Sequence, residues 1–193
     1  MTARYQLIVV GASRGGMNAL EKILCSLPTD FETPIAIAQH RHKQSNDRLP
    51  DFYRRSCRLR VMDANDKQHI EPGTVYFAPA DYHLLVDSGE FSLSCDEAVR
   101  YSRPSIDVLF ESAADAYASH LIGVVLTGAN DDGAAGVRRI KSRGGVVIVQ
   151  DPKTAESPEM PSAAIAAASV DRILPLEEIA PYLVERCQLA AYR

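Results

Sequence analysis

Short apolar runs alternate with longer amphipathic stretches along this chain, and that alternation restricts its fold more than any other feature. Runs such as Leu7–Val10 and Leu121–Leu126 are almost entirely apolar, which is typical of parallel strands buried on both faces. Strand–helix alternation with short connections predicts right-handed βαβ units. We therefore expect an α/β fold: a doubly wound, mostly parallel sheet of about seven strands with helices on both faces.

The strands are expected at Leu7–Val10, Pro34–Ala38, Arg58–Met62, Thr74–Ala78, Leu121–Leu126, Gly145–Val149 and Arg172–Leu174. The helices are expected at Gly16–Leu27, Ser45–Cys57, Ser105–Ser119, Asp132–Arg143, Met160–Ala168 and Leu176–Cys187. The segment His83–Ser94 departs from this rhythm, because two short strand-like runs flank an Asp-Ser-Gly turn. It predicts an antiparallel hairpin at the sheet edge or over one face.

One domain is expected, covering residues 1–193 with a core at about residues 5–187, because no repeat, low-complexity tract or linker divides the chain. A domain of this size buries roughly 70% of its unfolded surface, so it needs neither disulfides nor a metal to fold. The four cysteines lie far apart without a C-x-x-C pair, which indicates free thiols in a reducing compartment; they are Cys25, Cys57, Cys95 and Cys187.

The composition also excludes several kinds of partner. A net charge of −4 and a pI of about 5.7 argue against nucleic-acid binding. The N-terminus has no signal-peptide core, and no segment approaches the roughly 20 apolar residues of a membrane helix. We therefore expect a cytoplasmic protein without membrane insertion.

Three residues with catalytic potential each follow one of the buried strands. Ser13 follows the first strand, His40 follows the second, and Asp132 comes after the strand at Leu121–Leu126. In open parallel sheets, ligands bind beyond the carboxyl ends of the strands. A serine hydroxyl becomes a nucleophile when a histidine takes its proton and a carboxylate orients that histidine. The placement therefore predicts a Ser-His-Asp triad, and glycines beside Ser13 suit a tight turn that exposes its hydroxyl.

Plain structural roles remain open for the same residues. Ser13 and Asp132 would suit helix caps, and His40 would suit a loop histidine bonded to a carbonyl. Their joint placement at three strand ends favours catalysis. Three other histidines lack this placement and are interpreted as surface or structural residues: His42, His69 and His120. A basic run near His40 favours a solvated face over a docking site for an acidic partner; it comprises Arg41, Lys43, Arg54, Arg55, Arg58 and Arg60.

Two other functions are compatible with parts of the pattern. Gly11–Gly15 after a strand is similar to the opening of a short-chain dehydrogenase that binds a dinucleotide. However, Met17 occupies the third glycine position, no acidic residue follows the second strand, and no tyrosine has a lysine four residues later. A non-catalytic interaction module on the same scaffold is the second alternative.

The motifs, taken in order, resemble the catalytic domain of the chemotaxis protein-glutamate methylesterases of the CheB type. The resemblance covers nearly the whole chain. Gly11–Gly16 is similar to the family's nucleophile turn, Gln39-His40 to its histidine segment, and Leu126–Gly133 to its aspartate loop. Further segments that resemble the family are Val75–Pro79, His83–Leu85, Arg103–Phe110, Gln150-Asp151 and Met160-Pro161. The Asp-Gly match selects Asp132 over Asp131.

The resemblance implies a cytoplasmic hydrolase that removes methyl esters from glutamate side chains of chemoreceptors and releases methanol. It also implies deamidation of particular receptor glutamines and needs no metal or organic cofactor. The expected partner is the cytoplasmic domain of a methyl-accepting chemoreceptor, and the expected state is a monomer. The usual N-terminal receiver domain is missing, and the leading Met1 favours a stand-alone member.

The chain departs from the family pattern at two places that line the expected cleft. Arg41-His42 replaces the common Met-Pro after the histidine, and Ala129-Asn130 replaces a common Met-Gly. Alanine leaves room where methionine would pack, and asparagine would disfavour a positive-φ turn. These changes predict a wider, less organised site with slow catalysis.

Overall fold

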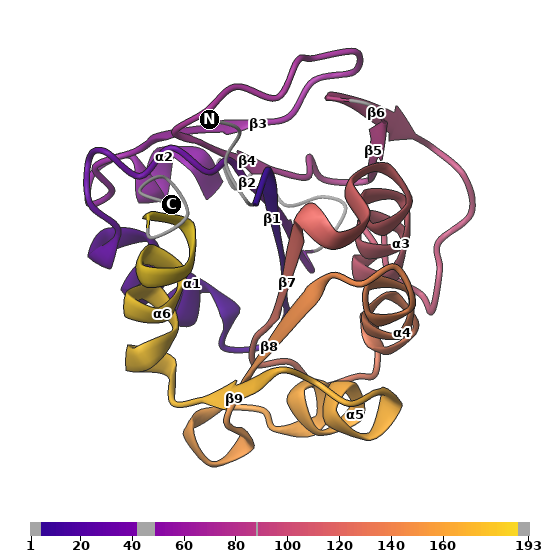
Figure 1. Ribbon diagram of the computed structural model, residues 1–193. Helices are drawn as coiled ribbons and strands as arrows, with labels where there is room; N and C mark the ends of the chain where they lie inside the picture. The colour runs from indigo at the N-terminus through magenta and orange to yellow at the C-terminus, as the bar shows by residue number, and fades with distance from the viewer. Residues whose placement is uncertain (1–4, 42–48, 88, 189–193) are drawn as a thin grey trace.

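The computed structural model describes residues 5–41, 49–87 and 89–188. Seven strands form one sheet in the order β3-β4-β2-β1-β7-β8-β9, and every neighbouring pair is parallel (Figure 1). The strands are β1 Leu7–Ala12, β2 Ile35–Gln39, β3 Arg60–Asp63, β4 Thr74–Phe77, β7 Leu121–Val125, β8 Val146–Gln150 and β9 Arg172–Leu174. The predicted doubly wound parallel sheet is confirmed, with each strand within two residues of its expected bounds.

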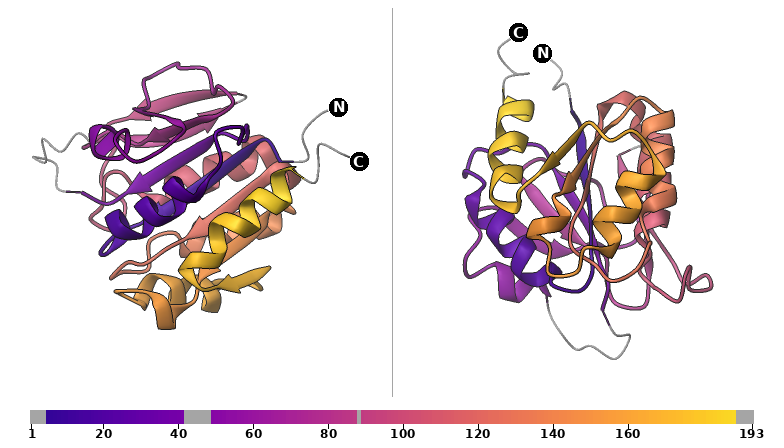
Figure 2. Two further views of the ribbon diagram at one scale, coloured as in Figure 1. Left: turned by 90° about the vertical axis from the view of Figure 1, so that its left-hand side faces the viewer. Right: turned by 90° about the horizontal axis from the view of Figure 1, so that it is seen from below.

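Helices cover both faces of the sheet, as Figures 1 and 2 show. One core includes residues of α1 (Gly16–Ser26), α2 (Leu49–Tyr53) and α6 (Leu176–Gln188). The other includes residues of α3 (Ile106–Tyr117), α4 (Ala134–Ser142) and α5 (Glu159–Ala167). Two short 3₁₀ helices complete the set, at Ala118–His120 and Pro152–Thr154. None of the described helices is long and apolar enough to cross a membrane.

The residues of β1 show how the two cores are separated. Ile8, Val10 and Ala12 belong to the first core, while Leu7 and Val9 belong to the second. All five are at most 4% exposed. Successive side chains of a strand point to opposite faces of the sheet, so an uninterrupted apolar run is what a doubly covered strand requires.

The predicted hairpin is present as a sheet of its own. Strands β5 (His83–Asp87) and β6 (Glu90–Ser94) pair antiparallel with each other and do not extend the seven-stranded sheet. Phe91 packs edge-on against Tyr76 of β4 with ring centroids 4.8 Å apart. Its backbone N–H donates to Gln68 O in the loop after β3, so the hairpin lies beside the β3–β4 end of the sheet.

Several helices are shorter than the sequence predicts, and local contacts explain two of the differences. The helix expected at 45–57 is described only from residue 49 and ends at Tyr53; residues 45–48 lie outside the described chain. Cys57 N donates back to Tyr53 O, which turns the chain toward β3. The helix expected from Asp132 begins at Ala134, because Gly133 has a φ of 98° and the Asp132 side chain is engaged elsewhere.

The strand order brings three loops together. Strand β1 lies between β2 and β7, so the segments that follow these three strands meet at one edge of the sheet. From its carboxyl end, β1 connects to β2 on one side, whereas the neighbouring β7 connects to β8 on the other side, so a topological switch point lies between β1 and β7. Ser13, His40 and Asp132 all lie in these segments.

Candidate active site

Ser13 occupies a tight turn between β1 and α1. Gly16 N donates to Ser13 O at 2.8 Å, and Gly15 takes a φ of 77°, which glycine adopts at little cost. Ser13 N donates to Thr127 O at 3.0 Å, which joins this turn to the loop after β7. A Cβ added at Gly128 would lie 2.9 Å from the Ser13 Cβ, so the two loops are in close contact.

His40 lies between the serine and the aspartate. Its Nδ1 is 3.2 Å from Ser13 Oγ, and its Nε2 is 2.7 Å from Asp132 Oδ2. A carboxylate accepts hydrogen bonds only, so Nε2 carries the proton and Nδ1 of the neutral ring presents a lone pair to the serine hydroxyl. The predicted hydrogen-bonded arrangement of the three side chains is therefore present in the structure.

Asp132 is completely buried, and four donors surround its carboxylate. Oδ2 accepts from His40 Nε2 and from Ile106 N at 2.8 Å, while Oδ1 accepts from Asp107 N at 3.0 Å and Ser105 Oγ at 3.1 Å. The two backbone donors belong to the first turn of α3, where a negative charge is stabilised. Burial raises the pKa of Asp132, but the hydrogen bonds from His40, Asp107 and Ile106 outweigh it, and the net pKa is lowered.

The neighbouring Asp131 is engaged with a different partner. Its carboxylate forms a short ion pair with Arg100, and its side chain is 60% exposed. The Arg100 hydrogen bond is the main cause that lowers the pKa of Asp131. Asp132, and not Asp131, contacts His40, which agrees with the choice made from the Asp-Gly match.

Three supporting residues were not recognised as such from the sequence. Gln39 Nε2 donates to Ser13 O at 2.9 Å and to His40 O at 3.1 Å. These two bonds link the loop after β1 to the loop after β2. Ser105 caps α3 through Val108 N and bonds Asp132. His83 is buried and accepts from Ser105 N at 3.1 Å. Two sequence signals marked Ser105: its place at the start of a predicted helix, which suits a cap, and its place in the Arg103–Phe110 segment that resembles the family.

The positions that depart from the family pattern have defined surroundings. Arg41 Nη2 donates to Ala78 O at 2.9 Å and lies 3.4 Å from Asp63, whereas His42 lies outside the described residues. The prediction that Asn130 would disfavour a positive-φ turn here is wrong, because the residue of this loop with a positive φ is Gly133 and not Asn130. Asn130 instead orients its side chain toward His40, with Nδ2 3.4 Å from His40 Nδ1.

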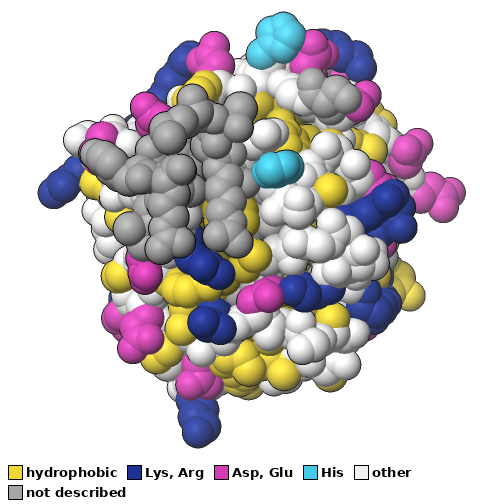
Figure 3. Space-filling view, in the orientation of Figure 1, with side chains coloured by type: hydrophobic (Ala, Val, Ile, Leu, Met, Phe, Trp, Pro, Cys, Tyr) yellow, Lys and Arg dark blue, Asp and Glu magenta, His cyan; other side chains and the backbone are white. Residues whose placement is uncertain are grey.

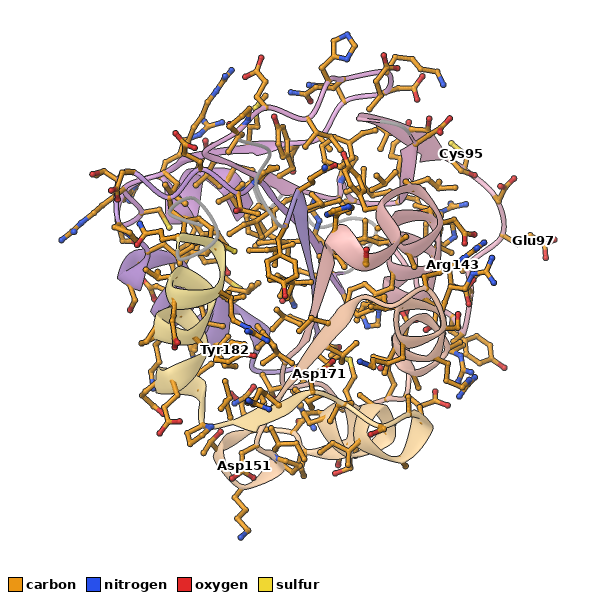
Figure 4. The ribbon with its side chains drawn as sticks, in the orientation of Figure 1. Cys95, Glu97, Arg143, Asp151, Asp171 and Tyr182 are labelled. Atoms are coloured by element: carbon orange, nitrogen blue, oxygen red, sulfur yellow. The ribbon has the colours of Figure 1, made fainter. Side chains whose placement is uncertain are left out.

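A cavity of about 370 Å³ lies next to His40. It is lined by His40, Arg41, Asp81 and residues 97–98 and 101–104. Figure 4 shows Glu97 on the loop that leads from β6 to α3. Arg103 binds Asp81 across this region at 2.6 Å, and Tyr101 at the rim is fully exposed. The cavity provides room for a side chain beside His40.

Three residues of the basic run near His40 form ion pairs within the chain: Arg41 with Asp63, and the two that follow. Arg54 binds Asp51, and Arg60 binds Glu71, each at 2.8 Å. Lys43 lies outside the described residues. Figure 3 shows acidic and basic side chains interspersed over one face of the molecule. These pairs support the interpretation of a solvated face.

The remaining predicted surface histidines fit their assignment. His69 is exposed and lies 3.2 Å from Glu90, and His120 lies in a 3₁₀ helix before β7. The four cysteines are free thiols in the structure.

Comparison with known proteins agrees with this geometry. The CheB methylesterase family model matches residues 8–183. A Leptospira interrogans protein, provisionally named protein-glutamate methylesterase/protein-glutamine glutaminase, is 49% identical over 93% of this chain and 94% of its own length. Protein-glutamate methylesterase/protein-glutamine glutaminase 1 of Carboxydothermus hydrogenoformans is 43% identical over 91% of this chain, which spans only 53% of that relative.

A solved structure shows the same fold. The CheB methylesterase catalytic domain of Thermotoga maritima superimposes with a TM-score of 0.89, covers 94% of this chain and 98% of its own, and is 34% identical. The family match spans the nucleophile turn, the histidine segment and the aspartate loop. The chain therefore belongs to the CheB methylesterase family.

Proposed function

We propose that this chain hydrolyses methyl esters of glutamate side chains on the cytoplasmic domains of chemoreceptors. The hydrogen-bonded series Ser13–His40–Asp132 is the observation that carries the proposal. The relatives' names supply the reaction, protein-glutamate methyl ester hydrolysis. In this proposal Ser13 is the nucleophile, His40 is the general base and acid, and Asp132 orients His40.

The reaction follows from the positions of the protons. Ser13 Oγ attacks the ester carbonyl carbon while its proton moves to His40 Nδ1, and Asp132 stabilises the resulting imidazolium. When the tetrahedral intermediate collapses, His40 gives this proton to the methoxy oxygen, and methanol leaves. Water then attacks the acyl-serine with His40 again as the base, which releases the glutamate carboxylate and restores Ser13.

The developing negative charge on the carbonyl oxygen requires hydrogen-bond donors. The backbone N–H groups of Arg14 and Gly15 directly follow Ser13 at the N-terminus of α1, and they donate to no acceptor within the described residues. Helix N-termini stabilise anions through such groups. We assign these two N–H groups to the oxyanion site.

The names of the relatives also include protein-glutamine glutaminase activity. The same acyl-serine would form from a glutamine side chain, with ammonia leaving in place of methanol. The dehydrogenase alternative has no such support, because His40 at the end of β2 is bound to Ser13 and Asp132. The non-catalytic alternative predicts no turnover at all.

Methanol release from a methylated chemoreceptor fragment tests the proposal. We expect Ser13→Ala to lower the rate by several orders of magnitude, because triad residues act as a unit. Its stability should fall by no more than about 1–2 kcal/mol. Ser142→Ala is the matched control, since Ser142 is an exposed serine at the end of α4. Turnover by Ser13→Ala at the wild-type rate would refute the assignment.

Because the proposed substrate is the cytoplasmic part of a receptor, we propose that the enzyme works in the cytoplasm. We further propose that it is a single-domain monomer. Light scattering at working concentration gives the oligomeric state, and a single cooperative unfolding transition would support one domain.

A further inference from the structure

Asn130 lies in the loop between β7 and α4, two residues before Asp132. Its Oδ1 accepts a hydrogen bond from Asp132 N at 3.3 Å, and its Nδ2 lies 3.4 Å from His40 Nδ1. The backbone N–H of Asp132 needs an acceptor, which places the oxygen of the Asn130 amide on that side. The NH₂ group therefore faces the serine–histidine pair.

The donor side of this amide is not satisfied by the residues that the structure describes. His40 Nδ1 has one lone pair, and Ser13 Oγ approaches it at 3.2 Å, closer than Asn130 Nδ2. An amide nitrogen carries two N–H groups, of which only one can point at that lone pair. The other has no acceptor among the described residues, although the side chain is only partly exposed. An acceptor supplied by a bound substrate would satisfy it.

We propose, resting on the function proposed above, that Asn130 is a further catalytic residue that donates a hydrogen bond to the ester carbonyl oxygen. Ser13 Oγ and Asn130 Nδ2 both lie close to the same His40 nitrogen, so a carbon bonded to Oγ brings its oxygen into the neighbourhood of Nδ2. The bond strengthens as the carbonyl oxygen becomes an oxyanion. Asn130 thereby adds a side-chain donor to the backbone N–H groups of Arg14 and Gly15.

A purely structural role for Asn130 would use only its oxygen. Asparagine commonly accepts a hydrogen bond from the backbone two residues later and so stabilises a turn. That role predicts that any short acceptor at position 130 preserves activity. The catalytic role requires the amide N–H groups, so the two roles predict different outcomes for different substitutions.

The test compares Asn130→Ala with Asn130→Ser. Serine keeps a short acceptor for Asp132 N but does not extend as far toward His40. We expect both variants to lose about 10²–10³ in kcat, the usual effect of one missing oxyanion donor, with KM and Tm nearly unchanged. Asn65→Ala is the matched control, because Asn65 lies in the loop after β3 and bonds Gln68. Activity of Asn130→Ala at or above the wild-type level, or recovery in Asn130→Ser, would overturn the proposal.

Binding of a small alkyl boronic acid provides a readout that does not depend on the receptor substrate. The boronate adds to Ser13 Oγ, and one of its oxygens occupies the oxyanion position. We expect the Kd of Asn130→Ala to rise by about the same factor as kcat/KM falls, because the missing donor acts on both. An unchanged boronate Kd would overturn the role of Asn130. A receptor fragment that is not hydrolysed by wild type, with boronate binding still dependent on Asn130, would instead reject only the proposed substrate.

Discussion

Asp132→Asn replaces one carboxylate oxygen with an NH₂ group of nearly the same size. The wild-type carboxylate accepts from four donors, two at each oxygen. With the amide oxygen facing Asp107 N, the new NH₂ group faces His40 Nε2 and Ile106 N. The NH₂ group then donates to His40 Nε2, which forces the ring proton onto Nδ1. Nδ1 can no longer accept the proton of Ser13.

The expected loss in kcat is about 10⁴, the size that a wrong histidine tautomer causes in triad hydrolases. The stability effect is smaller. Ile106 N loses its acceptor in a fully buried site, which costs about 1–3 kcal/mol, and this range includes the lost charge at the N-terminus of α3. For a chain of this size that corresponds to a fall in Tm of about 2–12 °C.

Single-turnover methanol release measures the first quantity, and calorimetry measures the second. Asp131→Asn is the matched control, because Asp131 is exposed and binds Arg100 instead of His40. It should keep kcat within about threefold, since its amide still accepts from Arg100 and exposed ion pairs contribute little. Equal losses in Asp131→Asn and Asp132→Asn would refute the tautomer argument, as would an Asp132→Asn variant that keeps most of the wild-type kcat.

Two further predictions follow from the same site. The pKa of Asp132 is lower in the folded state than in the unfolded chain, where it has the ordinary aspartate value of about 3.9. The ionised Asp132 carboxylate therefore contributes fully to folding stability above that ordinary pKa. This contribution is lost as the pH falls through the lowered pKa of the folded state. Urea unfolding at a series of pH values should show a constant stability difference between wild type and Asp132→Asn from about pH 5 to 7, shrinking below about pH 4; a difference that grows toward acid pH would contradict this. Gly128→Ala places a Cβ 2.6 Å from Met160 Sδ and 2.9 Å from the Ser13 Cβ, so it should destabilise the fold by about 1–3 kcal/mol and lower kcat by moving the nucleophile. A Gly128→Ala variant with wild-type Tm and kcat would show that both neighbours yield without cost.

The sequence by itself determined the strands and the residues that end them. An apolar run such as Leu7–Val10 satisfies the requirements of a doubly buried strand locally, so its position is readable without the partners. Because parallel strands end at one edge of a sheet, the residues after the strands could be assigned to the same edge from the sequence. The strand order, with β1 between β2 and β7, then makes Ser13, His40 and Asp132 neighbours on that edge.

Only the tertiary structure decided which groups surround that pair. Ser105, Gln39 and Asn130 each bond to residues of other loops, or across a turn, in a geometry that depends on how the loops pack. Asp132 lies within hydrogen-bond distance of α3, although 25 residues or more separate them in the chain. Hydrogen bonds depend on distance and angle between specific atoms, whereas hydrophobic burial depends only on which face is covered. The periodicity of a sequence therefore predicts the sheet, and the directional contacts of the site appear only when the chain is folded.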